Sequence, residues 1–278
     1  MADKGRSLAQ AVATSFLLLG LVIVSYVLGR VAFFVLASAV VLFAFYELLD
    51  VAGRKGLRPN LVFGLCCCFG LMLAAYLRKP EWVLSVAAAT GIGSLLLALL
   101  PQRGSSATYD VAWTVLGVAW IGGGGAAAVS ILALPREGLK LLILFMLVAA
   151  ADDIGAYFVG SALGRHKMAP LVSPSKTWEG FAGGVAGAFA VAAVLIPLWT
   201  RLDLFEALAI GAIVALLAPC GDLVESLVKR ELKVKDSGTL LPGHGGMLDR
   251  LDAILFCAPA VFLYLHWILP SSVRLTVS

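Results

Sequence analysis

Residues 226–252 form a dense group of charged side chains and glycines in an otherwise apolar chain. They read SLVKRELKVKDSGTLLPGHGGMLDRLD. Charged side chains are costly beside a lipid bilayer, so a group like this one next to apolar runs indicates a functional site. Carboxylates bind hard cations, whereas lysine, arginine and glycine backbone amides bind phosphate. The mixture therefore favours a site for a metal-bound nucleotide over a site for a simple anion.

The residues that lead into this segment predict a polar face on a membrane helix. Four side chains are spaced so that they share one helical face, namely Asp222, Glu225, Ser226 and Lys229. Such a face should point toward water or protein, because lipid does not solvate it. The simpler alternative is a lysine–glutamate pair that ends a membrane helix at the bilayer surface.

The glycine-rich middle of the segment predicts a bend that precedes a last helix. Pro242 and its neighbouring glycines interrupt any helix, and Asp249 then enters the final apolar run. We predict that Asp222 and Asp249 hold a divalent cation such as Mg²⁺. Lys235 and Arg250 are predicted to contact phosphate oxygens. The alternative is a connecting loop whose charges pair with one another.

A third polar segment, residues 151–180, reads ADDIGAYFVGSALGRHKMAPLVSPSKTWEG. Asp152 and Asp153 lie toward the end of an apolar run, where ionisable side chains are rare unless they serve a function. The SPSKT sequence adds hydroxyl groups and a cation as predicted anion contacts: Ser173, Ser175, Lys176 and Thr177. Glu47 is a lone acid in another apolar run. Its sequence context leaves open whether it packs against a partner or faces lipid.

The composition of the chain is typical of a membrane protein. Of its 278 residues, 61% are hydrophobic and 14% are charged, against about 45–50% and about 25% in soluble domains. We therefore predict an all-α polytopic membrane protein. The net charge of +4 is explained by loop positioning and does not indicate a nucleic-acid partner. Three of the five cysteines are consecutive, Cys66 to Cys68, a spacing that excludes a metal site or disulfide framework among them.

Apolar runs of about 20 residues can cross a membrane as helices, and on that rule we predict about nine transmembrane helices. They lie near residues 8–28, 31–49, 61–77, 82–100, 111–134, 139–160, 178–199, 204–228 and 251–269. We divide the chain into N-terminal membrane helices, residues 1–135, and a C-terminal catalytic part, residues 136–278.

The distribution of lysine and arginine predicts a cytoplasmic N-terminus. With nine spans, the N-terminus and alternate loops together hold most of the 21 basic residues, and cytoplasmic loops carry such an excess. The charged loops 161–177 and 229–250 fall on this side, where a nucleotide substrate would be found. Much of the bias comes from the second of these loops.

The charged segments resemble the phosphatidate cytidylyltransferase family, also called CDP-diacylglycerol synthases. The family signature is similar to S-x-φ-K-R-x4-K-D-x-small-x2-φ-P-x-H-G-G-φ-x-D-R-φ-D, where φ is apolar, and this chain fills it at every position from Ser226 to Asp252. The GDLxES sequence before it and the segment from Asp153 to Gly180 also resemble the family. The resemblance covers roughly the C-terminal half. In the family a small residue precedes the acid at Asp153, so Asp152 is a departure and Asp153 is the favoured functional acid.

The resemblance implies a nucleotidyltransferase of phospholipid biosynthesis that converts CTP and phosphatidate to CDP-diacylglycerol and pyrophosphate. It implies dependence on Mg²⁺, with room for a second cation, monovalent or divalent. Elementary chemistry agrees, because two anions must approach and cations cancel their repulsion. A phosphate monoester is largely ionised near pH 7, so no strong general base is required.

The residues in the matched segments receive the following predicted roles. The catalytic residues are Asp222, Asp249, Lys229 and Arg250, and the metal ligands among them are Asp222 and Asp249. The substrate-binding residues are Asp153, Ser173, Ser175, Lys176, Thr177, Ser226, Arg230, Lys235, Asp236, His244, Gly245 and Gly246.

The same resemblance predicts where the protein works. An integral protein of the bacterial inner (plasma) membrane is expected, with its active site facing the cytoplasm in a cavity open sideways to lipid. Phosphatidate and other membrane lipids are then partners within the bilayer, and CTP is the soluble partner. A homodimer is compatible with the sequence.

Two other functions compete with this prediction. A CTP-dependent kinase of a polyprenol-type alcohol would need a similar site but would release CDP instead of pyrophosphate. An ion-coupled transporter could use Asp152, Asp153 and Asp222 as ion ligands. The transporter is disfavoured, because the polar residues gather at one membrane face and no inverted repeat is evident.

Overall fold

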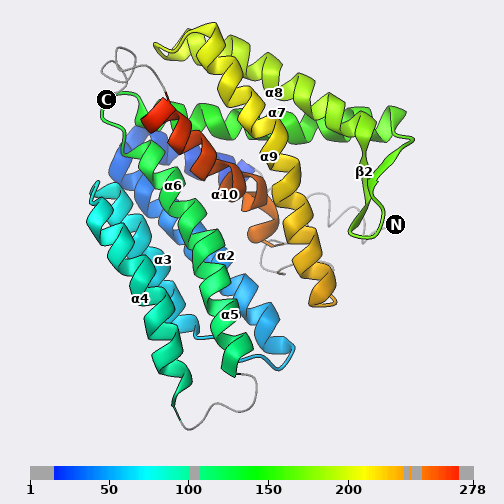
Figure 1. Cartoon of the computed structure of the whole chain (residues 1–278). Coiled ribbons are helices and arrows are strands. Elements are labelled where there is room, and N and C mark those ends of the chain that lie inside the picture. Colours follow the sequence, from blue (N-terminus) through cyan, green and yellow to red (C-terminus); the bar gives the residue numbers. More distant parts are fainter. Residues whose placement is uncertain (1–15, 101–106, 235–237, 239–245, 269–278) are drawn as a thin grey trace. The chain divides into compact units, whose positions relative to one another are not determined.

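The computed structural model describes residues 16–100, 107–234, 238 and 246–268 (Figure 1). Within these residues the chain is helical except for connecting segments and one short pair of strands. It divides into two compact units. The first unit comprises Met1–Val129 and Glu231–Leu251, and the second comprises Ser130–Arg230 and Asp252–Ser278.

Apart from a helix at its N-terminal end, the first unit is a set of apolar helices that run alongside one another (Figure 1). A helix at Phe16–Leu28 is followed by α2 (Arg30–Arg54), α3 (Leu61–Tyr76), α4 (Pro80–Ala98), α5 (Ala107–Gly117), the π-helical turn η1 (Val118–Gly122) and α6 (Gly123–Leu132). The fully buried ring of Phe45 in α2 lies against Gly64 and Gly117, where a Cβ atom would collide with it. These glycines therefore allow α2 to pack closely on α3 and α5.

A buried acid fixes the segment that leads into α3. Asp110 in α5 is 1% exposed, and its Oδ1 accepts a hydrogen bond from the backbone N–H of Arg58 at 2.6 Å. Thr114, one turn later, accepts the backbone N–H of Asn60 at 2.9 Å. Buried polar groups need such partners, so this pair holds the turn between α2 and α3.

The second unit contains the helices and strands that surround the candidate site. Its elements are α7 (Gly138–Leu163), β1 (Lys167–Ala169), β2 (Ser173–Thr177), α8 (Trp178–Trp199), α9 (Leu204–Glu231), α10 (Leu248–Leu263) and the π-helical turn η2 (Tyr264–Ile268). The final residue of α9 and the first turn of α10 belong to the first unit, and the last three residues of α6 belong to the second. Residues 161–177, expected as a loop, instead include an antiparallel hairpin that pairs Lys167 with Thr177 and Ala169 with Ser173.

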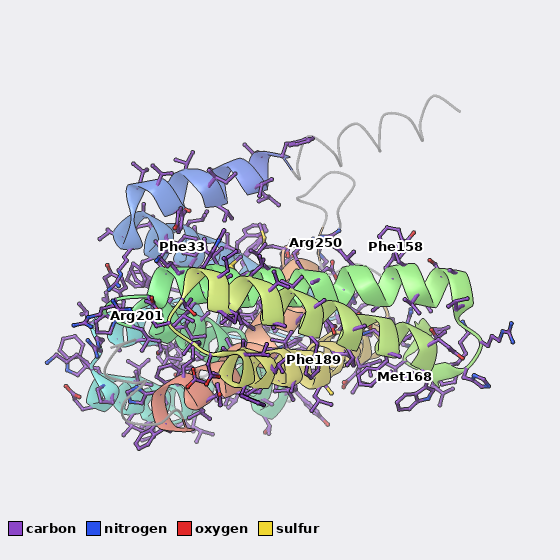
Figure 2. All side chains as sticks on the ribbon, turned by 90° about the horizontal axis from the view of Figure 1, so that it is seen from above. Phe33, Phe158, Met168, Phe189, Arg201 and Arg250 are labelled. Carbon is purple, nitrogen blue, oxygen red and sulfur yellow. The ribbon has the colours of Figure 1, made fainter. Side chains whose placement is uncertain are left out.

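Helices α7 and α8 lie side by side because glycines line their contact. A Cβ on Gly183 would approach Val159 at 2.5 Å and the carbonyl oxygen of Gly155 at 2.6 Å. Small residues let helix backbones approach in this way in membranes. Figure 2 labels Met168 near one end of this helix pair and Arg201 near the other, so the hairpin and the α8–α9 connection lie at opposite ends.

The predicted all-α membrane fold is confirmed, with the short β1–β2 hairpin as the exception among the described residues. Each predicted span overlaps a helix in the described part of the chain. Six helices are long and apolar enough to cross a membrane, with α5, η1 and α6 counted as one continuous helix, Ala107–Leu132, whereas Phe16–Leu28 and Leu61–Tyr76 are shorter. The count of nine spans and the cytoplasmic N-terminus stay predictions.

Candidate active site

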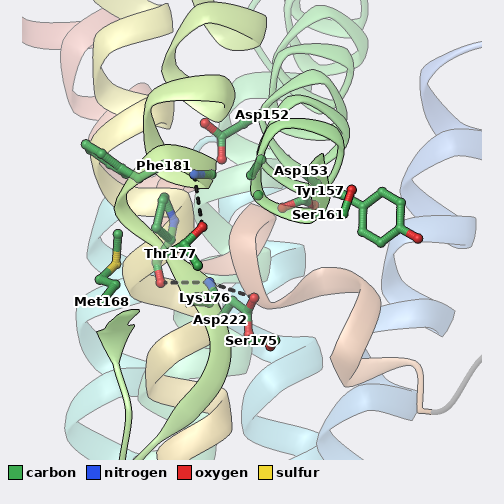
Figure 3. A pocket seen from close by; sticks show the side chains of 14 residues that line it. Asp152, Asp153, Tyr157, Ser161, Met168, Ser175, Lys176, Thr177, Phe181 and Asp222 are labelled. Atoms are coloured by element: carbon green, nitrogen blue, oxygen red, sulfur yellow. Dashed lines mark hydrogen bonds and ion pairs between the residues drawn. The ribbon is translucent and has the colours of Figure 1, made fainter. Parts of the chain in front are cut away.

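A cavity of about 370 Å³ lies among α7, the hairpin, the first turn of α8 and α9. Its volume lies in the range of about 300–1,000 Å³ that is usual for small-molecule sites. Figure 3 shows its lining, in which the charged members are Asp152, Asp153, Lys176 and Asp222. Two regions that the sequence analysis treated separately, residues 151–180 and the polar helix face that begins at Asp222, therefore line one cavity.

Lys176 on β2 is bound to Asp222 on α9. Its Nζ lies 2.7 Å from Asp222 Oδ2, and the two side chains are 20% and 39% exposed. The same Nζ donates a hydrogen bond to the carbonyl oxygen of Pro219 at 3.4 Å (Figure 3). The pair is thus half-buried and open to the cavity, where a cation suits phosphate oxygens and a carboxylate suits a hard cation.

Thr177 joins the hairpin to α8 as its N-cap. Its Oγ1 accepts a hydrogen bond from the backbone N–H of Gly180 at 3.1 Å, and the residue is 4% exposed. A threonine at this position satisfies one of the N–H groups that a helix start leaves without a partner. Gly160 in α7 and Gly164 directly after it lie against this threonine, so these glycines allow the SPSKT strand to come close. The predicted substrate contact of Thr177 stays a prediction.

The two adjacent acids of α7 differ in their surroundings. Asp152 is 2% exposed, and its Oδ1 has no hydrogen-bond partner among the described residues. A Cβ on Gly184 would come within 2.8 Å of that oxygen. Asp153 is exposed, and both acids line the cavity. The preference for Asp153 over Asp152 as the functional acid stays a prediction.

Three acids gather where α9 and α10 meet in the second unit. Asp222, Glu225 and Asp252 each offer a carboxylate oxygen, and these oxygens lie within 4.8 Å of one another. Glu225 is 2% exposed and Asp252 is 8% exposed. Gly221 permits the approach, because a Cβ there would come 2.8 Å from the backbone oxygen of Asp252. Carboxylates this close repel each other unless a cation or proton intervenes, and oxygen ligands suit Mg²⁺.

Neighbouring polar side chains support this acid cluster. Ser226 Oγ donates a hydrogen bond to Asp222 Oδ1 at 3.3 Å, and Lys229 Nζ lies 3.1 Å from Glu225 Oε2. Glu225 and Asp252 were absent from the predicted site residues. Glu225 lies on the polar helix face that the sequence predicts, and Asp252 is the last residue of the family signature. The sequence therefore contained an indication for both residues.

The start of α10 orients Asp249. The backbone N–H of Gly246 donates a hydrogen bond to Asp249 Oδ2 at 2.6 Å, so a glycine of the signature holds this carboxylate. Asp249 lies three residues before Asp252 on the same helix and therefore on the same face. Because Asp249 and Asp222 belong to different compact units, their joint binding of one metal stays a prediction.

The remaining predicted residues lie on the hairpin, on α9 and α10, or outside the described residues. Ser173 is buried, with its Oγ 3.5 Å from that of Ser175. Arg230 Nε donates a hydrogen bond to the carbonyl oxygen of Val172 at 3.3 Å, and Arg250 is exposed. Four predicted residues lie outside the described residues: Lys235, Asp236, His244 and Gly245.

Known proteins resemble this chain over most of its length or over about half of it. It is 35% identical to the phosphatidate cytidylyltransferase of Bacillus subtilis over 276 residues, 95% of this chain and 97% of that protein. It is 31% identical to that of Staphylococcus haemolyticus over 242 residues, 86% and 91% of the two chains. A match to the uncharacterized protein YnbB of Escherichia coli is 44% identical over 132 residues, but it covers 47% of this chain and 44% of that protein. The pattern of the cytidylyltransferase family matches residues 9–268, and the chain therefore belongs to the cytidylyltransferase family.

Proposed function

We propose that this protein is a phosphatidate cytidylyltransferase, which makes CDP-diacylglycerol from CTP and phosphatidate for phospholipid biosynthesis. The observation that carries the proposal is the cavity in which Lys176 and Asp222 are paired beside Asp153, in a chain that belongs to the cytidylyltransferase family. Cations and carboxylates together suit a metal-bound nucleotide. The apolar helices around them suit a substrate whose acyl chains remain in the bilayer.

The proposed reaction transfers a cytidylyl group between two phosphates. A phosphate oxygen of phosphatidate forms a bond to the α-phosphorus of CTP, and the bond from that phosphorus to the bridging oxygen of the β-phosphate breaks. Pyrophosphate leaves with the bonding electrons. Catalysis of this kind depends on positioning and on stabilising charge rather than on covalent chemistry of the protein. No side chain needs to remove a proton from the attacking phosphate.

The carboxylates around Asp222 are proposed to hold Mg²⁺. Asp222 and Asp249 are the proposed ligands, and Glu225 and Asp252 add two buried carboxylates next to Asp222. The donor set fits a hard cation, because all of these groups offer oxygen. When bound, the ion neutralises phosphate charge. A second cation, monovalent or divalent, is compatible with a cluster of this many acids.

The basic and hydroxyl side chains are proposed to bind the phosphates of the two substrates. Lys176 lines the cavity, and Lys229 and Arg230 follow Asp222 on α9. Ser175 and Thr177 line the same cavity. In the glycine-rich segment, the backbone N–H of Gly246 donates a hydrogen bond to Asp249. We propose that His244 and Gly245 shape the loop that binds the nucleotide.

The proposed location is the inner membrane of a bacterium, with the site facing the cytoplasm. The chain is a membrane protein with bacterial relatives, and CTP is found in the cytoplasm. Phosphatidate would enter the cavity sideways from the bilayer. A homodimer remains compatible with this arrangement.

The experiment that tests the function uses the purified full-length protein in detergent with radiolabelled CTP, Mg²⁺ and phosphatidate. We expect a labelled CDP-lipid and one pyrophosphate for each product. With a polyprenol-type alcohol in place of phosphatidate, we expect the protein to consume no labelled CTP. CDP release and lipid phosphorylation with the alcohol would instead support the lipid kinase, and solute flux in liposomes without nucleotide consumption would support a transporter.

A further inference from the structure

Glu47 is a buried acid in α2 to which the proposed chemistry gives no role. The residue is 4% exposed, although it lies in a helix apolar enough to cross a membrane. An acidic side chain in such a helix is costly to bury and indicates a function by default. The sequence left two roles open for Glu47, and burial excludes the lipid-facing one.

The hydrogen-bond partner of Glu47 lies 201 residues away along the chain. Glu47 Oε2 accepts a hydrogen bond from the backbone N–H of Leu248 at 3.1 Å. Leu248 is the first residue of α10, where backbone N–H groups have no partner within the helix and the helix dipole favours negative charge. Glu47 therefore caps α10 from a different helix of the same compact unit.

The turn that Glu47 caps is the turn that carries Asp249. Asp249 follows Leu248 directly, and its Oδ2 accepts the backbone N–H of Gly246 at 2.6 Å. The backbone N–H of Arg250 also donates to the carbonyl oxygen of Met247 at 3.1 Å. Displacement of this turn would therefore move the Asp249 carboxylate, because the turn is held together by its own hydrogen bonds.

The second carboxylate oxygen of Glu47 lies against Gly238. A Cβ built on Gly238 would collide with Glu47 Oε1. This oxygen is buried and has no hydrogen-bond partner among the described residues. Gly238 occupies the small-residue position of the signature, so the contact gives a physical reason for a small residue there. Glu47 thus contacts the signature at two places that lie ten residues apart in the chain.

We infer that Glu47 is a positioning residue for the cytidylyltransferase reaction, anchoring the first turn of α10, and with it Asp249, to α2. The inference rests on the proposed function, because that function makes Asp249 a metal ligand. The property required of residue 47 is a hydrogen-bond acceptor at the length of a glutamate side chain. A neutral acceptor of the same size should therefore serve.

The test compares variants that separate the acceptor from the bulk of the side chain. Glu47→Gln keeps both the size and a carbonyl oxygen, whereas Glu47→Leu keeps roughly the volume and removes the acceptor. Asp110→Leu is the matched control, because Asp110 is also buried and also accepts a backbone N–H, but near the start of α3. Each full-length variant is assayed for kcat, KM for CTP, Mg²⁺ dependence, melting temperature and hydrogen exchange of residues 246–252.

We expect Glu47→Leu to lower kcat by about 10- to 100-fold, as loss of a partner that orients a metal ligand does. KM for CTP should change less, the Mg²⁺ concentration for half-maximal rate should rise, and amides 246–252 should exchange faster. Glu47→Gln should keep kcat within about threefold of the unsubstituted protein. Asp110→Leu should lower the melting temperature without this loss of kcat or this change in exchange.

Unchanged kcat in Glu47→Leu, or an equal loss of kcat in Asp110→Leu, would overturn the inference. Hydrogen exchange distinguishes this result from failure of the proposed function. If the unsubstituted protein makes no CDP-lipid, the proposed reaction is wrong. Faster exchange of residues 246–252 in Glu47→Leu, but not in Asp110→Leu, would still support the anchoring of α10 by Glu47. Unchanged exchange in Glu47→Leu would contradict the anchoring of α10 by Glu47, whatever the activity of the variant.

Discussion

Lys176 and Asp222 form an ion pair of 2.7 Å between strand β2 and helix α9. Ion pairs that are accessible to solvent contribute little to stability, about 0–1 kcal/mol, so this pair is better suited to position its side chains than to hold the fold. Glu225 and Lys229 form a second, more buried pair at 3.1 Å, one turn further along α9. We expect substrate binding to exchange these partners, with phosphate taking the lysines and the metal taking the carboxylates.

The metal assignment predicts the effect of removing one carboxylate charge. In Asp222→Asn or Asp249→Asn, an amide replaces a carboxylate of the same size, which weakens the ligand without creating a void. We expect each substitution to lower Mg²⁺-dependent turnover of CTP with phosphatidate by at least about 100-fold, while the melting temperature stays near that of the unsubstituted protein.

Asp110→Asn provides the control for this prediction, because it removes the charge of a buried acid that does not line the cavity. We expect it to retain turnover. Chelation of divalent cations with EDTA should abolish the activity of the unsubstituted protein, and added Mg²⁺ should restore it. Near-normal turnover by either purified site variant would refute its metal role.

Helices α7 and α8 position the two walls of the cavity through close backbone contact. Gly155 on α7 faces Gly183 on α8, and Gly160 faces Gly180 at the end next to the hairpin. This contact places the acids of α7 beside the SPSKT strand that precedes α8. The cavity therefore depends on glycines, which have no side chain with which to contact a substrate.

A side chain at the α7–α8 contact should separate the helices. Gly183→Val would drive its Cβ into Val159 and the backbone of Gly155, and we expect a loss of stability of about 1–3 kcal/mol together with lower turnover. Thermal unfolding in mild detergent measures the first effect. Gly91→Val in α4 is the control, because nothing lies within 4 Å of the Cβ position there. Equal melting temperatures for the two variants would show that the contact does not limit stability.

The whole chain is a membrane protein in which six of the described helices are long and apolar enough to span a bilayer. Its membership of the cytidylyltransferase family extends over residues 9–268, so the N-terminal helices belong to the family as well as the charged C-terminal half. Glu47 gives one physical reason, because an N-terminal helix supplies the cap for α10.

The proposed orientation predicts which ends of the helices are accessible from each side of the membrane. Arg165 follows α7 and Arg201 follows α8, and both are exposed. In a chain without its native cysteines, we expect Arg201→Cys to react with a membrane-impermeant maleimide in intact spheroplasts. Arg165→Cys should react only after lysis, because the proposed site faces the cytoplasm. The opposite labelling pattern would reverse the orientation.

Much of the fold followed from local sequence because helix formation and hydrophobicity are local properties. The predicted span at residues 178–199 coincides with α8, and the predicted face of Asp222, Glu225, Ser226 and Lys229 lies on one continuous helix, α9. The hairpin at residues 167–177 was not predicted, because its strands are three and five residues long and carry no clear alternation of polar and apolar residues.

The sequence by itself determined the membrane class, the order of the helices and the segments that could hold a metal-bound nucleotide, since these depend on composition and on spacing within one segment. Only the tertiary structure decided that Lys176 pairs with Asp222, that Asp252 joins Asp222 and Glu225, and that Glu47 caps α10. These contacts join residues from separate helices and strands. Periodicity along a chain indicates the face of a helix on which a side chain lies, but packing between helices decides what that face meets.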